Sequence, residues 1–531
     1  MHRNAPGTLP SDRGATVAPL KDASVRSKIR SLDELTQVAL KAHSQGKRVV
    51  LCHGVFDLVH LGHVRHLEHA RRQGEVLVVS LTADRFVNKG PDRPVFSELQ
   101  RAEMIAAMSY VDWVAINHAP DAVPMIDAIQ PSIYVKGSDY AEAAEDVTGK
   151  IAVERQAVEA YGGQIVFTDD IVFSSSGLIN QHLNLFDAEV RETLDELRTE
   201  FGLAGILNWI DRIKDCKVLL VGDTIIDEYS YVSAMSKPIK ENIIATRFQD
   251  RETFAGGVIA SANHIASFVR NVEIITCLGG NDSHNDLVHA ALKPNVKLTP
   301  VARVGSPTTR KLRYVDATYT RKMFEVYFCD DTPLPEALQV QFDAEVARRL
   351  DEYDVVVAND YGHGLIASCT VHMLAHQARF LAVNAQSNSA NMGFNMVSKY
   401  PRADYICIDA PEARLAAAER FADLSEIAGR FLPERIDCER IIITHGMHGC
   451  VTYQRGQPTR RMPALTKSVV DTMGAGDAFL AVTAPLIAAG APIRLVGFIG
   501  NIVGALKVRV VGHRSAVDKP SLIKALTSLL K

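Results

Sequence analysis

One stretch near the N-terminus constrains the fold of this chain more than any other. Residues 48–52 form a short apolar run, which is typical of a buried parallel strand. Apolar side chains then recur at helical spacing, at Leu61, Val64, Leu67 and Ala70. A helix is therefore expected from about residue 60 to residue 73. A strand, a glycine-bearing turn and a helix in this order predict an α/β domain built on a parallel sheet.

The turn between this strand and helix is a candidate phosphate site, because backbone N–H groups and the positive end of a helix dipole meet there. His60 and His63 lie three residues apart on the first helical turn, so their imidazoles share one face. Gly62 between them lets a ligand approach the backbone. Two imidazoles beside a helix N-terminus can donate hydrogen bonds to a phosphate whose charge grows as it is attacked.

Two alternatives to the phosphate site stay open at this stage. A zinc site is one, because five histidines crowd together here, namely His53, His60, His63, His66 and His69. No cysteine or carboxylate is spaced to complete a tetrahedral zinc set with them. A purely structural turn is the other alternative.

The string G-V-F-D-x-x-H-x-G-H over residues 54–63 resembles the signature of the nucleotidyltransferase superfamily of cytidylyltransferases and adenylyltransferases. Further segments resemble its sugar-phosphate branch, in particular the heptose-phosphate nucleotidyltransferases, at 89–95, 101–103, 111–114, 136–140 and 173–179. The resemblance covers about residues 48–185.

This resemblance implies roles for individual residues. It implies that His60, His63 and Lys89 are catalytic and that Asp139 contacts the sugar. It also implies that nucleotide and phosphate groups are bound by Gly54, Phe56, Gly62, Arg93, Lys136, Ser174, Ser175 and Ser176. Mg²⁺ would bridge the phosphates, and the nucleotide substrate would be either CTP or ATP. Without the wider motif, the loop with Lys89 and Arg93 would equally fit a solvated loop.

Length and composition limit the number of domains, the class of protein and the kinds of partner that can be expected. With 531 residues the chain is too long for one ordinary domain, and 47% hydrophobic and 23% charged residues are typical of a soluble globular protein. The net charge of -4 gives no electrostatic reason to expect nucleic acid or an anionic membrane as partner. Eight cysteines without a C-x-x-C pair favour reduced thiols and a cytoplasmic location. Residues 1–25 lack the apolar core of a signal peptide and predict a flexible tail, and no other window is apolar for long enough to span a bilayer.

We expect four segments along the chain. The flexible tail, residues 1–25, precedes a nucleotidyltransferase domain over 26–187, a helical connector over 188–215 and a second α/β domain over 216–531. In the first domain, helices are expected over 31–45 and 98–109. Further strands are expected over 75–82, 111–116, 133–136 and 164–168.

The second domain begins with an apolar strand over residues 217–222. Asp223 and Asp227 follow it, and these carboxylates can accept hydrogen bonds from sugar hydroxyls, although a structural turn is as good an interpretation of G-D-x-x-x-D alone. More strands are expected, at 355–358, 380–384, 405–409 and 441–444. Helical stretches separate them, which predicts a second parallel sheet.

The chemical centre of the second domain is D-T-M-G-A-G-D-A-F over residues 471–479. Gly474, Ala475 and Gly476 leave backbone N–H groups available at the start of an apolar helix, which makes an anion cradle. Asp477 at the same helix start can take the proton of an attacking hydroxyl as a general base. The alternative is an ordinary capped helix.

This motif resembles the catalytic signature of the ribokinase/PfkB sugar kinases, and the resemblance covers residue 217 to the C-terminus. It implies that Thr444, Gly446 and Gly449 of T-x-G-x-x-G approach the nucleotide and that Asn501 contacts adenine. Asp409-Ala-Pro-Glu412 resembles the N-x-x-E motif of the magnesium shell, which assigns Glu412 to the metal. The sugar-binding set implied by the resemblance is Asp223, Asp227, Gly256, Gly257 and Asn263.

The two resemblances together imply a bifunctional enzyme like the heptose kinase/nucleotidyltransferase family, with the domain order reversed. The kinase half departs from that family at three places. Its D-Y-x-K-G has His363 in place of Lys, its D-P-K is replaced by residues 384–386 (Asn-Ala-Gln), and the Asn expected after the glycine pair is Ala260, with Asn263 nearest. The amide-rich run 384–395 is either a hydroxyl-binding lid or a polar loop.

The sequence therefore predicts nucleotide-sugar precursor synthesis, of the kind that supplies lipopolysaccharide. The first domain would transfer a nucleotidyl group from CTP or ATP to a sugar phosphate, and the second would phosphorylate a sugar or sugar phosphate with ATP. One alternative is an alditol-phosphate cytidylyltransferase with its own kinase. Another is a transferase that carries a non-catalytic, sugar-sensing kinase fold. The family resemblance also suggests a homodimer.

Overall fold

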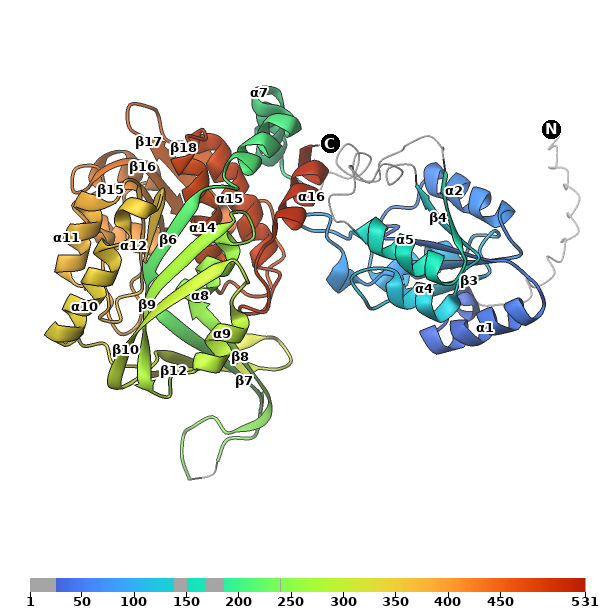
Figure 1. Ribbon diagram of the computed structural model, residues 1–531, viewed down its shortest axis with the longest axis horizontal. Helices are drawn as coiled ribbons and strands as arrows, with labels where there is room; N and C mark the ends of the chain where they lie inside the picture. Colours follow the sequence, from blue (N-terminus) through green and yellow to red (C-terminus); the bar gives the residue numbers. More distant parts are fainter. Residues whose placement is uncertain (1–24, 138–149, 169–185, 239, 531) are drawn as a thin grey trace, which may run out of the picture. The chain divides into compact units, whose positions relative to one another are not determined.

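The computed structural model describes residues 25–137, 150–168, 186–238 and 240–530. The chain divides into two compact units. The first comprises residues 1–87 and 94–173, and the second comprises residues 88–93 and 174–531. Both contain a parallel sheet with helices, so the predicted fold class is confirmed (Figure 1).

A five-stranded parallel sheet in the order β3-β2-β1-β4-β5 forms the centre of the first unit. Its strands are β1 (Val49–Gly54), β2 (Val76–Thr82), β3 (Trp113–Asn117), β4 (Ile133–Gly137) and β5 (Gln164–Thr168). The neighbours of β1 on its two sides are β2 and β4, so the chain reverses direction across the sheet at β1. Ligands of open parallel sheets bind at this kind of switch point, outside the carboxyl ends of the strands.

Helices cover both faces of this sheet, because its strands bury alternate side chains on opposite sides. Val50 and Cys52 of β1 join one apolar cluster with Leu67 of α2, whereas Val49 and Leu51 join a second cluster. The helices are α1 (Leu32–Ser44), α2 (Leu61–Arg72), α3 (Glu98–Ala106), α4 (Val123–Ile129) and α5 (Lys150–Ala160). Ser31 caps α1 through a capping box with Glu34, which confirms the helix start expected from the sequence.

The second unit contains a nine-stranded sheet in the order β10-β9-β6-β13-β14-β15-β16-β17-β18. Its neighbouring strands pair parallel, except that β17 pairs antiparallel with both β16 and β18. Its strands are β6 (Lys217–Gly222), β9 (Asn271–Asn281), β10 (Val296–Pro307), β13 (Val355–Asp360), β14 (Leu381–Ala385), β15 (Arg402–Asp409), β16 (Asp437–Thr444), β17 (Cys450–Gln454) and β18 (Arg460–Met462). β6 lies between β9 and β13, so the residue that follows it, Asp223, stands at the switch point of this sheet.

Two large apolar clusters lie on opposite faces of the nine-stranded sheet. Val218 and Leu220 of β6 belong to one, and Leu219 and Val221 to the other. The first cluster includes helices α7 (Ala188–Arg212), α8 (Val258–Ile265), α14 (Ala475–Ala488), α15 (Ile493–Lys507) and α16 (Lys519–Leu530). The second includes α10 (Glu336–Ala347), α11 (Ser368–Gln377) and α12 (Ala410–Ala417). The helix α7, predicted as a connector, is thus part of the core of the second unit.

A second, four-stranded sheet in the order β12-β11-β7-β8 also belongs to this unit, and it was not predicted from the sequence. Its strands are β7 (Thr224–Ala234), β8 (Thr246–Gly257), β11 (Arg310–Asp316) and β12 (Arg321–Phe328). Figure 1 shows the hairpin of β7 and β8 projecting from the body of the unit. β7 starts directly after Asp223, so this sheet reaches the carboxyl end of β6.

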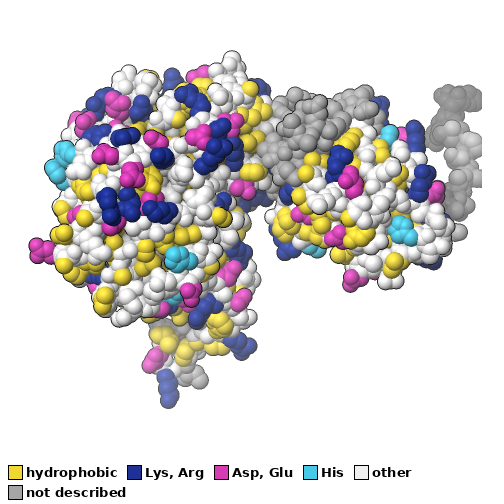
Figure 2. Space-filling model, viewed as in Figure 1, with side chains coloured by type: hydrophobic (Ala, Val, Ile, Leu, Met, Phe, Trp, Pro, Cys, Tyr) yellow, Lys and Arg dark blue, Asp and Glu magenta, His cyan; other side chains and the backbone are white. Residues whose placement is uncertain are grey.

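Acidic and basic side chains are interspersed over the visible face of the second unit (Figure 2). All eight cysteines have free thiols. Among the described residues, no helix combines the length and the hydrophobicity that crossing a bilayer requires.

Candidate active sites

In the first unit, the predicted phosphate site is a turn between β1 and α2. His60 caps α2, and its Nδ1 accepts a hydrogen bond from the Gly62 backbone N–H over 3.1 Å. His63 Nδ1 accepts in turn from the His60 N–H over 3.4 Å. The two rings stack with centroids 4.0 Å apart, and the ring of Phe56 packs against His63 at 5.2 Å. The structure thus brings together Gly54, Phe56, His60, Gly62 and His63.

These hydrogen bonds define the donor atoms of the two histidines. An imidazole that accepts a hydrogen bond at Nδ1 carries its proton at Nε2 when it is neutral. Both His60 and His63 therefore have an Nε2–H group that can donate. Two donors held by the first turn of one helix suit a phosphate that gains negative charge.

The neighbouring histidines have other contacts. His53 lies against Ser80 and Thr82 on β2, and burial lowers its pKa well below the usual value. His66 bonds to Thr168, and His69 lies beside Gln73. Within the part of the chain that the structure describes, these histidines form no group of three ligand atoms close enough for a metal ion.

A buried arginine holds the turn in place. The Arg101 side chain is fully buried and donates to the backbone carbonyls of Val55 and Thr82 and to the Asp84 carboxylate. Asp57 accepts from the backbone N–H of Val95 over 2.6 Å. The turn is thus fixed to the end of β2 and to the segment before α3.

The other predicted residues of this site are not all gathered at the turn. Lys136 is buried in an ion pair with Glu154, at 2.9 Å. Lys89 and Arg93 group with the second unit. Asp139, Ser174, Ser175 and Ser176 lie outside the described residues. The roles of these residues toward phosphate and sugar stay predictions.

In the second unit, the carboxyl ends of the parallel strands bring the predicted kinase residues to one edge. Asp223 follows β6, Asp360 ends β13, Asp409 ends β15 and Thr444 ends β16. Asp477 lies in the first turn of α14, which packs against β13 and β15.

Asp477 is a buried carboxylate held by two neutral donors. Its Oδ1 accepts from the Tyr361 hydroxyl over 2.8 Å and from the Gln386 amide over 3.1 Å. Burial raises the pKa of Asp477 above its ordinary value. A raised pKa strengthens a carboxylate as a proton acceptor, which suits a general base.

The glycine turn before Asp477 is fixed by Asp471 and Lys507. Asp471 accepts from the Tyr229 hydroxyl, the Lys322 ammonium and the backbone N–H of Met473 and Gly512, at 2.7 to 3.1 Å. Lys507 Nζ donates to the carbonyls of Met473 and Gly512, and burial lowers its pKa to about 8. The N–H of Ala475, predicted to be available, donates to the Thr472 carbonyl over 3.3 Å. The next N–H groups of α14 have no acceptor within the helix, so this turn can hold an anion.

Asp227 is neutralised within the protein. It pairs with Arg313, and its Oδ2 lies 3.1 Å from His513 Nε2. Burial opposes ionisation of Asp227, but Arg313 and His513 outweigh it and hold its pKa well below the usual range. A Cβ on Gly256 would lie 2.0 Å from Asp227 Oδ2, so the glycine pair at 256–257 lies directly against this carboxylate.

Asp223 and Asp360 form a buried acidic pair. Asp223 Oδ2 accepts from the Tyr361 N–H over 3.0 Å. Asp360 accepts from the Tyr400 hydroxyl and pairs with Lys399. Burial, and after it the charge of Asp360, raises the pKa of Asp223 to about 6. These carboxylates can accept hydrogen bonds from a polyol, and the role of Asp223 toward the sugar stays a prediction.

The amide-rich run bonds to this region. Asn388 and Asn391 donate to the carbonyl of Tyr361, and Asn395 donates to Asp360. Gln386 of the same run reaches Asp477. The run therefore positions the loop after β13, and the choice between a hydroxyl-binding lid and a polar loop stays open.

Glu412 and Asp409 form a capping box at the start of α12. Each carboxylate accepts the backbone N–H of the other residue, at 3.0 and 2.8 Å. Burial and the neighbouring charge of Asp409 raise the pKa of Glu412. Two crowded carboxylates at the edge that also carries Asp477 suit a hard divalent cation such as Mg²⁺, which prefers oxygen ligands.

Two predicted residues have their side chains engaged by the protein itself. Asn501 donates to the carbonyls of Met462 and Pro463, and Asn263 bonds to the backbone of Ala291 and Lys293. Their roles toward adenine and sugar stay predictions. Tyr361 and Gln386, by contrast, contact Asp477, and neither of them was predicted from the sequence as a site residue.

Comparison with known proteins identifies the two halves. The model of the pfkB family carbohydrate kinases matches residues 215–520, which is more than half of the chain. The chain belongs to the pfkB family of carbohydrate kinases. The cytidylyltransferase-like family model matches residues 51–181. The predicted enzyme classes, a nucleotidyltransferase-like domain and a carbohydrate kinase domain, are therefore confirmed.

Curated relatives resemble this pfkB-family chain in its N-terminal region. The bifunctional protein HldE of Syntrophotalea carbinolica is 41% identical over 145 residues, which cover 27% of this chain and 28% of the relative. The protein of the same name from Geotalea uraniireducens is 39% identical over 163 residues, with 30% and 32% covered. The chain thus spans about a third of the length of the curated relatives it matches.

Among solved structures, a putative ribokinase from Agrobacterium tumefaciens is 16% identical with a TM-score of 0.48, and the match covers 60% of this chain and 99% of that chain. A ribokinase from Thermotoga maritima is 18% identical with a TM-score of 0.46, and 59% and 99% are covered.

Proposed function

We propose that this protein is a bifunctional enzyme of nucleotide-sugar precursor synthesis. Its second unit phosphorylates a sugar or sugar phosphate with ATP, and its first unit transfers a nucleotidyl group from ATP or CTP to a sugar 1-phosphate of the heptose class. The observation that carries the proposal is the buried carboxylate of Asp477 beside the Gly474–Gly476 turn, held by Tyr361 and Gln386.

In the kinase reaction, the sugar hydroxyl loses its proton to the Asp477 carboxylate as its oxygen attacks the γ-phosphorus of ATP. The bond from that phosphorus to the β-phosphate oxygen breaks, and ADP leaves. The N–H groups at the start of α14 bind the oxygens of the transferred group. Asp223 and the glycine pair at 256–257 orient the sugar.

In the transferase reaction, a phosphate oxygen of the sugar phosphate attacks the α-phosphorus of the nucleotide, and pyrophosphate leaves. The Nε2–H groups of His60 and His63 donate to the oxygens that gain charge. Lys89, Arg93 and Lys136 contribute positive charge to the phosphates. Catalysis here depends on positioning and charge stabilisation.

Mg²⁺ fits the carboxylates of the second unit, and Glu412 with Asp409 would hold it. The ion supplies charge neutralisation to the phosphates of the nucleotide. A cytoplasmic location, where sugar phosphates and nucleotides are available, and assembly as a homodimer belong to the same proposal.

A second candidate has one specific observation in its favour. His363, Asn384 and Gln386 replace two cationic motifs of the heptose-kinase resemblance, so the kinase unit would accept a sugar without the expected phosphate, such as an alditol, or only sense one. The intact Asp477 and glycine turn favour a working kinase.

The test is an assay of the purified full chain in which ADP and pyrophosphate are followed separately, with a panel of sugars and sugar phosphates. Heptose 7-phosphate should release ADP, and heptose 1-phosphate should release pyrophosphate. Asp477→Asn should reduce ADP release by about 10²–10⁴-fold and leave pyrophosphate release unchanged. Pyrophosphate release without ADP from any sugar would refute the bifunctional assignment.

A further inference from the structure

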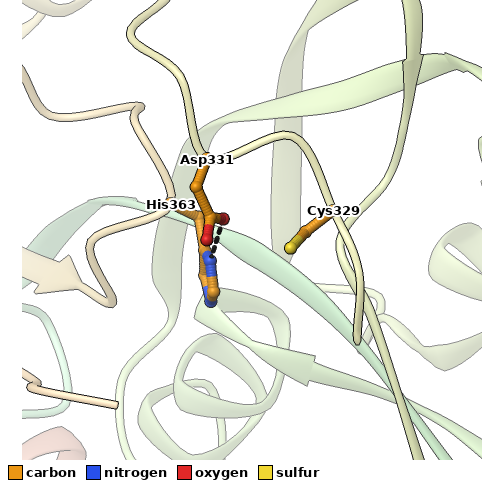
Figure 3. A group of neighbouring side chains, drawn as sticks. All are labelled: Cys329, Asp331 and His363. Carbon is orange, nitrogen blue, oxygen red and sulfur yellow. Dashed lines mark hydrogen bonds and ion pairs between the residues drawn. The ribbon is translucent and has the colours of Figure 1, made fainter. Parts of the chain in front are cut away.

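Three side chains of the second unit that are good ligands for a transition metal lie together. Cys329, Asp331 and His363 each offer one ligand atom, and these atoms all lie within 4.8 Å of one another (Figure 3). Cys329 and Asp331 come directly after β12 of the four-stranded sheet, and His363 comes after β13 of the nine-stranded sheet. Residues more than thirty positions apart thus meet at one point.

The two ring nitrogens of His363 have different surroundings. Its side chain is 1% exposed, and one ring nitrogen, Nδ1, lies 2.7 Å from the Asp331 carboxylate. The other, Nε2, is buried, and among the described residues it has no hydrogen-bond partner. Nδ1 is therefore the ring nitrogen that faces the Asp331 carboxylate, and it is the atom that can share an ion with Asp331 and Cys329 when the proton of the ring is on Nε2.

The two segments that carry the ligands are held rigidly. Arg303 donates to the carbonyls of Asp330 and Thr332 and pairs with the Asp330 carboxylate. Gly364 has φ +83°, and a Cβ there would lie 2.2 Å from the Thr332 carbonyl oxygen. The segment after β12 and the loop after β13 are therefore packed backbone against backbone, and the site is preorganised.

The chemistry of the ligands selects the kind of cation. A thiolate and an imidazole favour borderline metals such as Zn²⁺ and Co²⁺, whereas Mg²⁺ and Ca²⁺ take oxygen ligands. Three protein ligands leave one position of a tetrahedral ion open to water or to an anionic group. The site is thus distinct in chemistry from the carboxylates of Asp409 and Glu412.

We propose that Cys329, Asp331 and His363 form a binding site for one Zn²⁺-class ion per chain. The ion joins the end of β12 to the loop that follows β13. Since Tyr361 of that loop bonds to Asp477, metal occupancy fixes the segment next to the kinase carboxylate. The proposal goes beyond the proposed reactions and does not depend on the sugar.

The test uses the full chain, freed of metal with a chelator and then titrated with Co²⁺. Tetrahedral Co²⁺ with a cysteine ligand shows intense visible bands and a thiolate-to-cobalt charge-transfer band in the near ultraviolet. We expect saturation at one Co²⁺ per chain and displacement by one Zn²⁺. Zn²⁺ should also raise the unfolding temperature, because it binds the folded state.

Cys329→Ser should remove the charge-transfer band and weaken Zn²⁺ binding at least about tenfold. Cys369→Ser is the matched control, because this exposed cysteine of α11 lies outside the group, and it should leave the spectrum unchanged. If Cys329→Ser does not fold, Asp331→Asn serves as the second variant, with weaker binding and a retained thiolate band. The site is refuted if the wild-type chain binds no stoichiometric Co²⁺ or if the band survives in Cys329→Ser.

Discussion

The side-chain amide of Gln386 donates a hydrogen bond to Asp477 Oδ1 over 3.1 Å. The sugar-kinase resemblance leads one to expect a lysine at this position. A neutral amide leaves the Asp477 charge less compensated than an ammonium group would, and burial raises the pKa of this carboxyl. The exchange of Lys for Gln therefore acts on the group that must accept the proton.

The first prediction concerns the pH dependence of the kinase. Asp477 is a base only when ionised, so activity is lost as pH falls through its pKa, and a raised pKa moves that loss to higher pH. Gln386→Leu removes one donor to the ionised carboxylate. The acid limb of kcat/KM for ADP release should move to higher pH by roughly 0.7 unit, the equivalent of a hydrogen bond of about 1 kcal/mol.

Gln457→Leu is the control for that shift, because Gln457 is exposed in the turn after β17. Its pH profile should match that of the wild-type chain. An unchanged acid limb in Gln386→Leu would show that Asp477 is not the titrating base.

The second prediction concerns His63 in the first unit. It distinguishes the hydrogen bond that its Nε2–H would donate to a phosphate from the contribution of its Nδ1 to the start of helix α2. His63→Asn keeps an acceptor for the His60 N–H but loses the Nε2–H donor. Pyrophosphate release should fall by about 10²–10³-fold in kcat, while ADP release stays unchanged. His69→Asn, on the same helix, should retain full transferase activity, and equal losses in the two variants would point to helix damage instead.

How far the sequence predicts the structure depends on burial. Strands of the parallel sheets, such as Val218–Val221, are buried on both faces and appear as continuous apolar runs. The four-stranded sheet was missed, because β12 is mostly exposed and its residues show no such run. Exposed strands of this kind are defined by their partners more than by their own sequence.

The residues of the candidate sites also fall into two groups, those that local sequence predicts and those that only the folded structure brings together. Asp477 and His60 belong to contiguous motifs, where spacing alone predicts the chemistry. Lys507 and His513 lie about thirty or more residues beyond Asp477, and only the packing of α15 and the segment after it brings them to the glycine turn. The ion pair of Lys136 with Glu154 likewise joins a strand and a helix that share no local pattern.

The third prediction concerns stability and pH at Asp471. Burial opposes ionisation here, but the Lys322 ammonium and the Gly512 and Tyr229 donors outweigh it and lower the pKa of Asp471 to about 2. A lowered folded-state pKa stabilises the protein above the ordinary carboxyl pKa of about 4, and this contribution is lost as pH falls toward about 2.

Asp471→Asn should therefore lose about 1–3 kcal/mol of unfolding free energy at neutral pH, and the difference from wild type should shrink as pH falls from about 4 toward 2. Denaturant titrations at several pH values measure it. Asp437→Asn removes an exposed partner of Arg455 and should cost less than about 0.5 kcal/mol. A constant difference at every pH would contradict the assignment.

The last prediction tests the glycine turn as a cradle. Gly474 has φ +70°, and a Cβ there would lie 2.6 Å from His513 Cε1. Gly474→Ala thus adds a clash with a buried ring to the backbone strain of about 1–2 kcal/mol. Gly490→Ala carries a similar strain, since Gly490 has φ +85°, but its Cβ meets no atom within 4 Å. Both variants should lose stability, whereas only Gly474→Ala should lose ADP release, by at least about tenfold, because displacement of the turn moves the donors that hold the transferred phosphoryl group. Equal kinase activity in the two variants, measured with saturating ATP at a temperature where both are folded, would show that the turn does not bind the phosphoryl group.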